Sequence, residues 1–134
     1  MGKHTHDTTD LTRNQSLVYG ALEGSDGPLS AYAILDELRE EGLRAPLQVY
    51  RALERLLELG LVHRLESLNA FVACSHPACE EDGTVAFAIC ETCGKVFEFT
   101  DIELKSRIGA WAKSNAFRPR KTAIEIRGLC AECA

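Results

Sequence analysis

Residues 46–60, Pro-Leu-Gln-Val-Tyr-Arg-Ala-Leu-Glu-Arg-Leu-Leu-Glu-Leu-Gly, decide the fold of the N-terminal half of this chain. Proline is favoured in the first turn of a helix and glycine just after the last, so the stretch is expected to be helical from about Pro46 to Gly60. Its large apolar side chains recur at helical spacing. They are predicted to form one buried stripe: Val49, Leu53, Leu56 and Leu57.

Two further helices are predicted on the N-terminal side of this stretch. Thr12 and Gln15 can form a capping box, which predicts a helix that runs from there to Gly24. Ser30 is a favoured N-cap residue and predicts a second helix that stops at Gly42. Residues 1–10 are polar and are expected to form a disordered tail.

A β-hairpin is predicted after the third helix, from strand-like runs at 61–66 and 70–74. Three helices followed by a hairpin is the order of a winged helix-turn-helix domain. The polar face of the third helix carries Gln48, Arg51 and Arg55, with the small Ala52 beside them. Such side chains can contact bases and phosphates. An ordinary solvated helix face would have the same composition.

The C-terminal half is predicted to be a smaller α+β module. Residues 75–83 break all periodicity and are interpreted as a linker. Strands are expected beyond them, near 85–89, 96–100 and 123–127. Thr100 and Glu103 can form another capping box, for a helix with three apolar residues on one side: Leu104, Ile108 and Trp111. The sequence thus predicts an α+β protein with a winged-helix domain over 1–75, a hinge over 76–83 and an α+β domain over 84–134.

The composition excludes several classes of protein. The 134 residues are 46% apolar and 26% charged, which is typical of a globular chain. The formal net charge of −5 argues against a generally basic nucleic-acid-binding surface, so any DNA-binding face must be local. No signal pattern opens the chain and no apolar stretch approaches ~18 residues, so a cytoplasmic location without a membrane span is expected.

Four of the six cysteines form the strongest motif in the sequence. Cys90 and Cys93 make one C-x-x-C pair, and Cys130 and Cys133 make another. In a reducing compartment, two such pairs are typical of a closed four-thiolate zinc site. Redox dithiols or cysteines that merely pack in the core are the alternatives. A closed site leaves no open position for chemistry, so this zinc is expected to be structural.

Other potential metal ligands gather around the predicted hinge. His63 falls on the hairpin, and Cys74, His76 and Cys79 follow it, while Glu98 interrupts an apolar strand and is expected to point opposite to Phe97 and Phe99. Each has an ordinary explanation: a solvated histidine, a small buried cysteine or an edge-strand charge. Together they offer nitrogen, sulfur and oxygen donors, a set suited to zinc.

Six stretches of the chain carry a resemblance to a known family: Leu-Ser-Ala-Tyr (29–32), Val-Tyr-Arg-Ala-Leu (49–53), Gly-Leu-Val-His (60–63), Phe-Val-Ala-Cys (71–74), Ile-Cys-Glu-Thr-Cys-Gly (89–94) and Gly-Leu-Cys-Ala-Glu-Cys (128–133). With these the sequence resembles the ferric uptake regulator family, most closely its zinc uptake regulator branch. The similarity runs from about Thr12 onward. Its specificity comes from the combination of the 49–53 stretch with the paired C-x-x-C motifs.

The resemblance implies a homodimeric, metal-dependent transcriptional repressor with two zinc ions per chain. Its winged helix would bind a double-stranded DNA operator, expected to be AT-rich and palindromic, and its α+β domain would dimerise. The structural zinc ligands would be Cys90, Cys93, Cys130 and Cys133. Three ligands of a regulatory zinc would be His63, Cys74 and Glu98. Tyr32, Tyr50 and Arg51 match DNA-contacting positions, and the wider DNA-binding face is expected to include Arg44, Gln48 and Arg55, with Arg64 adding positive charge.

The chain departs from the family pattern at the fourth ligand of the regulatory zinc. The pattern has a histidine seven residues before Cys90, where this chain has Gly83. His76 is favoured as the substitute, with Cys79 or water as alternatives. Gln48 also stands where the family commonly has threonine, which leaves the base preference of the third helix open.

The sequence therefore predicts a zinc-responsive repressor of zinc-uptake genes, and not an enzyme. Zinc at the hinge would lock the dimer in its DNA-binding geometry. A thiolate among the regulatory ligands favours zinc over harder ions. The alternatives are a sensor of iron or manganese in the same family, a zinc-stabilised thiol redox protein that uses Cys74 and Cys79, and a zinc module that binds other proteins.

Overall fold

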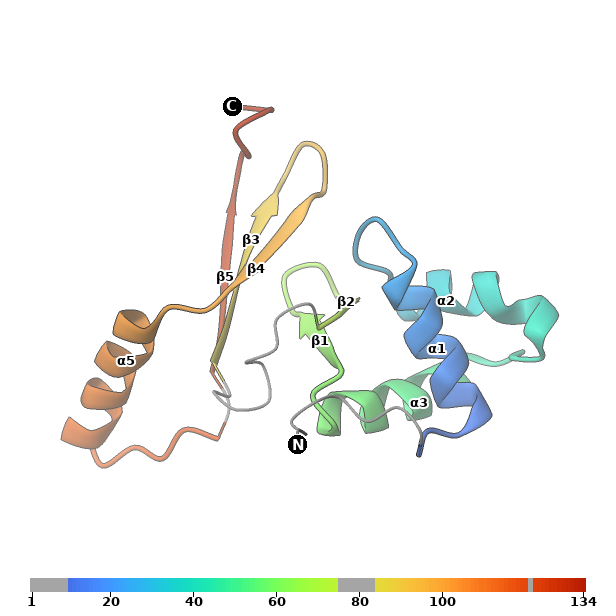
Figure 1. Ribbon diagram of the computed structural model, residues 1–134, viewed down its shortest axis with the longest axis horizontal. Helices are drawn as coiled ribbons and strands as arrows, with labels where there is room; N and C mark the ends of the chain where they lie inside the picture. Colours follow the sequence, from blue (N-terminus) through green and yellow to red (C-terminus); the bar gives the residue numbers. More distant parts are fainter. Residues whose placement is uncertain (1–9, 75–83, 121) are drawn as a thin grey trace. The chain divides into compact units, whose positions relative to one another are not determined.

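The computed structural model describes residues 10–74, 84–120 and 122–134. The chain divides into two compact units, Met1–Pro77 and Ala78–Ala134 (Figure 1). The predicted hinge, 76–83, lies outside the described residues. None of the helices in the described ranges is long and apolar enough to cross a membrane.

The first unit has the predicted order of three helices and a hairpin. Its elements are α1 (Arg13–Glu23), α2 (Ala31–Leu38), a short 3₁₀ helix η1 (Arg39–Glu41), α3 (Pro46–Glu58), β1 (Val62–Leu65) and β2 (Ala70–Ala73). Strands β1 and β2 are antiparallel, with Val62 opposite Ala73. Two backbone hydrogen bonds between Leu29 and Phe71, of 3.0 and 2.8 Å, attach the α1–α2 connection to β2. This is the winged helix-turn-helix arrangement that the sequence predicts.

The helix ends follow the predicted capping chemistry. Thr12 and Gln15 form the capping box: Gln15 donates its backbone N–H to Thr12 Oγ1 at 3.2 Å, and Thr12 donates its own to Gln15 Oε1 at 3.0 Å. Ser30 accepts the N–H of Ala33 at 3.1 Å. Gly42 ends the second helical segment with φ 109°, a left-handed conformation that favours glycine.

The core of the first unit is formed by all three helices and the hairpin. Helix α3 buries Val49, Leu53 and Leu56 as predicted, but two neighbours were misplaced. Leu57 is only partly buried, whereas Ala52, expected beside the polar face, is 3% exposed and packs in the core. The buried residues follow the i, i+3, i+4, i+7 pattern from Val49, which includes position 52 and leaves position 57 at the edge.

The second unit has the predicted β-β-α-β order. Its elements are β3 (Thr84–Cys90), β4 (Val96–Phe99), α5 (Ile102–Ser114) and β5 (Thr122–Gly128). They form a three-stranded sheet in the order β4-β3-β5, in which β4 is antiparallel and β5 parallel to β3. Because β3 and β5 run side by side in the same direction, their C-terminal ends lie at one end of the sheet (Figure 1).

One prediction about α5 was wrong. The N-cap is Asp101, which accepts the Leu104 N–H at 3.1 Å, and not Thr100. Trp111 is 59% exposed and lies against Phe117, with ring centroids 5.8 Å apart. Leu104, Ile108 and Trp111 do share one side of the helix, as i, i+4, i+7 spacing predicts, but Leu104 and Ile108 are only partly buried and the buried residue is the neighbouring Ala112.

Candidate metal sites and DNA-binding face

The sheet of the second unit brings the two C-x-x-C motifs together. Cys90 is the last residue of β3 and lies in register with Gly128, the last residue of β5. The Glu91 N–H donates to the Gly128 carbonyl at 2.8 Å, which holds the two chain segments together just beyond the strands. Parallel pairing therefore delivers the C-terminal motif beside the first one.

The four sulfur atoms are close enough to bind one ion. One Sγ atom from each of Cys90, Cys93, Cys130 and Cys133 lies within 4.8 Å of the others. The Sγ atoms of Cys93 and Cys130 are 3.8 Å apart. Tetrahedral zinc with Zn–S bonds of about 2.3 Å places its sulfurs about 3.8 Å apart. The four thiols thus fit a structural zinc ion, and all four cysteines are free of disulfides.

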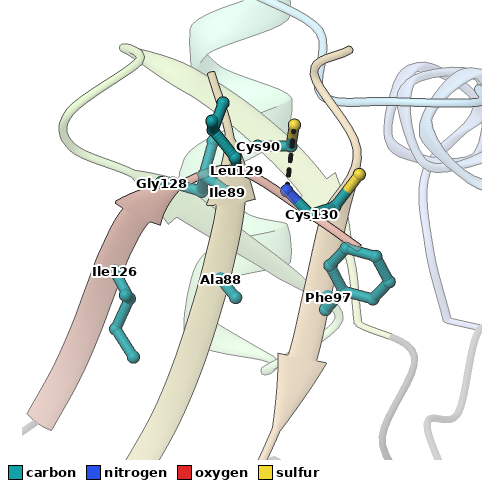
Figure 2. A pocket seen from close by; sticks show the side chains of 8 residues that line it. All are labelled: Ala88, Ile89, Cys90, Phe97, Ile126, Gly128, Leu129 and Cys130. Carbon is teal, nitrogen blue, oxygen red and sulfur yellow. Dashed lines mark hydrogen bonds between the residues drawn. The ribbon is translucent and has the colours of Figure 1, made fainter. Parts of the chain in front are cut away.

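Two backbone N–H groups stabilise the thiolate form of Cys90, the form that binds a metal ion. Its Sγ accepts the N–H of Cys93 at 3.5 Å and that of Cys130 at 3.4 Å, and Figure 2 shows the second of these bonds. These hydrogen bonds favour the thiolate and lower the pKa of Cys90 to about 6. Hydrogen bonds with the thiols of Cys130 and then Cys90 raise the pKa of Cys133 to about 12. Four thiolates in one cluster need a cation, and zinc would supply it by binding all four.

Two other residues with zinc-type donor atoms, His63 and Cys74, lie on or next to the hairpin of the first unit. His63 on β1 is opposite Val72, and the Cys74 N–H donates to the Leu61 carbonyl at 2.8 Å, which continues the ladder. Residues 63, 72 and 74 therefore share one face of the hairpin. A ring nitrogen of His63 and the Cys74 sulfur lie within 4.8 Å of each other, and His63 is only 5% exposed.

A further predicted ligand of a regulatory zinc, Glu98, belongs to the second unit. Glu98 is on β4 of the second unit, in register with Phe87 and, as predicted, on the face opposite Phe97. His76 and Cys79 lie outside the described residues. Cys74 is disulfide-bonded, and a zinc ligand must be a thiolate, so zinc binding there requires a reduced cysteine.

The predicted DNA-binding side chains lie on the exposed surface of the first unit. On α3, Tyr50 is 41% exposed, and Arg51 and Arg55 are exposed as well. Tyr32 on α2 is 61% exposed, and Arg44 is exposed in the connection before α3.

Two arginines near this face have acidic or amide partners. Arg55 pairs with Glu58 at 3.2 Å, and Arg64 donates to Asn69 at 3.0 Å. Exposed pairs of this kind contribute at most about 1 kcal/mol, so phosphates can compete for both arginines.

Gln48 has a structural role that the sequence did not suggest. Its Oε1 accepts the backbone N–H groups of Arg44 at 2.7 Å and Ala45 at 3.1 Å. The side chain therefore caps the first turn of α3. A glutamine at the third helical position was the available signal, but the usual Ser or Thr partner is replaced by Ala45, so no capping box could be recognised.

Comparisons with known proteins agree with this arrangement. The chain matches the model of the ferric uptake regulator family over residues 8–127. It is 40% identical over 124 residues to the zinc uptake regulation protein of Escherichia coli (strain K12), across 92% of this chain and 72% of that protein.

Two solved structures share both fold and sequence with the chain. The crystal structure of holo XcZur has a TM-score of 0.82 and 41% identity, over 91% of this chain and 84% of the other. A zinc uptake regulator complexed with zinc and DNA has a TM-score of 0.84 and 38% identity, over 90% of this chain and 81% of the other. The chain belongs to the ferric uptake regulator family.

Proposed function

We propose that this chain is a zinc-responsive, DNA-binding repressor of zinc-uptake genes that acts as a homodimer in the cytoplasm. The observation that carries the proposal is the His63–Cys74 pair, a set of zinc-type donors on the hairpin of a DNA-binding fold and separate from the four-thiol cluster. Similarity to the zinc uptake regulation protein of Escherichia coli, and to a zinc uptake regulator complexed with zinc and DNA, supports it.

Two zinc ions per chain have different roles in this proposal. The structural zinc would be held by Cys90, Cys93, Cys130 and Cys133, where every position is a thiolate and none is open. The regulatory zinc would be held by His63, Cys74, Glu98 and His76, with Cys79 as the alternative fourth ligand. Its mixed nitrogen, sulfur and oxygen donors suit an exchangeable zinc better than iron or manganese.

The regulatory ligands would control the orientation of the winged helix. His63 and Cys74 belong to the first unit and Glu98 to the second, so one shared ion would join the two units. In a homodimer this fixes the two third helices at a spacing that matches successive major-groove half-sites, ~34–36 Å apart. A 100-fold change in DNA affinity then needs only about 2.7 kcal/mol of coupling.

The DNA contacts would come from the exposed face of the first unit. Arg51 can donate two hydrogen bonds to a guanine, and Tyr50 lies beside it on α3. Tyr32, Arg44 and Arg55 would contact the phosphates. The Oε1 atom of Gln48 would fix the start of α3, and only the NH₂ group of that side chain would contact DNA. The operator is proposed to be AT-rich, as the family resemblance implies. It is also proposed to be palindromic, because a two-fold dimer requires a two-fold site.

A mobility-shift experiment tests the proposal directly. The full chain, kept reduced, is mixed with an AT-rich palindromic duplex from upstream of a zinc-uptake gene, with zinc or with a zinc chelator. A shift that requires zinc and exceeds the shift of a scrambled duplex is expected. Equal binding with zinc and with chelator would contradict the zinc response, and equal binding to both duplexes would contradict the repressor.

One observation favours a second candidate, a thiol redox protein that uses Cys74 and Cys79. Cys74 is disulfide-bonded, which a purely zinc-binding role does not require. This candidate predicts that the protein exchanges disulfides with a small thiol substrate at a rate that Cys74→Ser abolishes. The repressor predicts no such turnover, and zinc-dependent DNA binding by the fully reduced protein.

A further inference from the structure

The outward face of α3 can be located from its buried residues. Val49, Ala52, Leu53 and Leu56 all face the core. At 3.6 residues per turn, the opposite side of the helix is a line formed by Leu47, Arg51, Glu54 and Glu58. All four of these residues are exposed, and Leu47 is 58% exposed in the first turn.

A single exposed leucine is ordinary on a protein surface, but the position of this one is not. In helix-turn-helix proteins, the N-terminal residues of the recognition helix contact the base edges. Leu47 lies at that end, one turn from Tyr50 and Arg51. It is the only aliphatic side chain on the outward line of α3, whose other members are all charged.

The first turn of α3 holds Leu47 in a fixed place. Gln48 accepts two backbone N–H groups from the residues just before the helix, at 2.7 and 3.1 Å. Pro46 occupies the first helical position, where its fixed φ suits a helix. These contacts define where α3 begins and so fix the position of the Leu47 backbone relative to the rest of the helix.

The charges on α3 indicate which end enters the groove. Beyond Arg51, the outward line continues with Glu54 and Glu58, and Glu58 pairs with Arg55 at 3.2 Å. Carboxylates are repelled by phosphates, so the surface that Glu54 and Glu58 occupy is expected to stay away from the DNA backbone. The N-terminal turn, with Leu47, Tyr50 and Arg51, is left to meet the base pairs.

We infer that Leu47 determines specificity by contacting the C5-methyl group of one thymine in each half-site, beside the base that Arg51 contacts. The thymine methyl is the one apolar group that a base pair presents in the major groove, and leucine has no hydrogen-bonding group to offer any other edge. The inference rests on the proposed DNA-binding function, and it identifies one base, a thymine, that α3 would recognise in each half-site.

Deoxyuridine substitution tests the contact, because it removes the methyl group and nothing else. The probe is the tightest duplex selected from a randomised library by the reduced, zinc-loaded full chain. Each thymine of one half-site is replaced in turn by deoxyuridine, and affinity is measured by fluorescence anisotropy. At one position the parent protein is expected to lose about fourfold in affinity, the effect of one buried methyl group.

Variants assign this loss to Leu47. Leu47→Ala is expected to bind the thymine and deoxyuridine duplexes equally, whereas Leu47→Met, which keeps an apolar side chain, retains most of the difference. Ile102→Ala is the matched control, because Ile102 is an 84% exposed aliphatic residue on α5 of the second unit. It should behave like the parent. The exposed position of Leu47 means that its variants should melt at the parent temperature.

Two results would overturn the inference. One is a zinc-dependent duplex in which no thymine is sensitive to deoxyuridine, and the other is a sensitivity that Leu47→Ala retains in full. In both cases the repressor proposal survives, since specific zinc-dependent binding is still present. If the library yields no duplex that binds in a zinc-dependent way, the proposed function itself fails, and the Leu47 contact fails with it.

Discussion

Cys90 organises the thiol cluster at the scale of single residues. It is buried at the end of β3, and its sulfur accepts two backbone N–H groups that lower its pKa to about 6. Cys93, by contrast, is exposed. The two cysteines of one motif therefore differ: replacing Cys90 disturbs packing and metal binding together, whereas replacing Cys93 removes a ligand with little loss of packing.

Cys93→Ser is accordingly expected to lose the structural zinc and, with it, the stability of the second unit. Binding of structural zinc commonly contributes ~10–16 kcal/mol in small domains. Zinc content by atomic spectroscopy and thermal unfolding followed by circular dichroism measure the two effects. Cys74→Ser, the matched control, should keep the structural zinc. A Cys93→Ser protein that is folded and fully loaded with zinc would contradict the four-thiolate site.

Arg51→Ala is expected to remove specific DNA binding without changing zinc content or dimerisation. One bidentate arginine–guanine contact contributes ~1–3 kcal/mol, and a symmetric dimer loses two of them. Anisotropy with a selected duplex measures the loss. Arg39→Ala removes the same charge from η1, where Arg39 pairs with Asp36 at 3.1 Å, and should have little effect. Equal losses in the two variants would mean that only net charge matters.

Some residue-level features could be predicted from local spacing alone. The cap residues Thr12 and Ser30 are confirmed, and the two C-x-x-C pairs lie together as a four-thiol zinc site would require. The N-cap of the C-terminal helix, assigned to Thr100, and the helix face of Ala52 were predicted incorrectly, for different reasons. Asp101 and Thr100 are both good N-cap residues, so local sequence could not choose between them. Ala52 is small enough to fit either face of a helix, and only the packing of the first unit decides.

At the scale of secondary-structure elements, the turn after the second helix of the first unit depends on Gly42. Gly42 has φ 109°, and its N–H donates to the Arg39 carbonyl at 3.2 Å while Leu43 donates to the Leu38 carbonyl at 3.3 Å. These two bonds form a Schellman motif, which reverses the chain between the second and third helices. The geometry of the helix-turn-helix thus depends on a residue without a β-carbon.

Gly42→Ala is expected to destabilise the first unit by about 1–2 kcal/mol, the cost of a left-handed conformation for an L-residue. Gly20→Ala is the matched control. A β-carbon at position 20 meets nothing within 4 Å in α1, so this change should stabilise the protein by about 0.5–1 kcal/mol. Urea unfolding measures both. Equal effects of the same sign would contradict the assigned role of Gly42.

The order of elements was predictable because each one has a strong local signal. Alternating apolar residues gave β1 to β5, and the predicted strands end within a residue or two of the observed ones. The register in which β3 and β5 pair could not be predicted, since the two strands are far apart in the sequence and no tight turn between them fixes it. That register is what places Cys130 beside Cys90.

At the scale of the whole molecule, the proposal depends on ligands from both units acting on one ion. Cys74→Ser is expected to abolish zinc-dependent DNA binding and to keep the structural zinc. His76→Ala should weaken that binding at least tenfold, because even residues that only orient the ligands commonly change metal affinity by 10- to 100-fold, whereas Cys79→Ser should behave like the parent. Anisotropy at buffered free zinc measures all three. The reverse pattern, with Cys79→Ser blind to zinc, would make Cys79 the fourth ligand.

The relation between the two units was beyond the reach of sequence patterns. His63 and Cys74 share a face because the hairpin register is local, and this could be anticipated from the alternation of the strands. The proposed partnership with Glu98 involves residues far apart in the sequence: the donor types suggested it, and the specific ligand set came from resemblance to a family. The proposed homodimer likewise rests on that resemblance, since no local pattern identifies its surface.

The central claim is that one of two zinc ions controls DNA binding. The most direct measurement is the zinc content of the reduced protein before and after mild chelation, made on the same samples whose affinity for a selected duplex is determined. The account predicts two zinc ions per chain before chelation and one after, with a dimer that stays intact and a DNA affinity that falls about 100-fold. A single zinc ion per chain, or a DNA affinity that does not change when the second ion is removed, would contradict it.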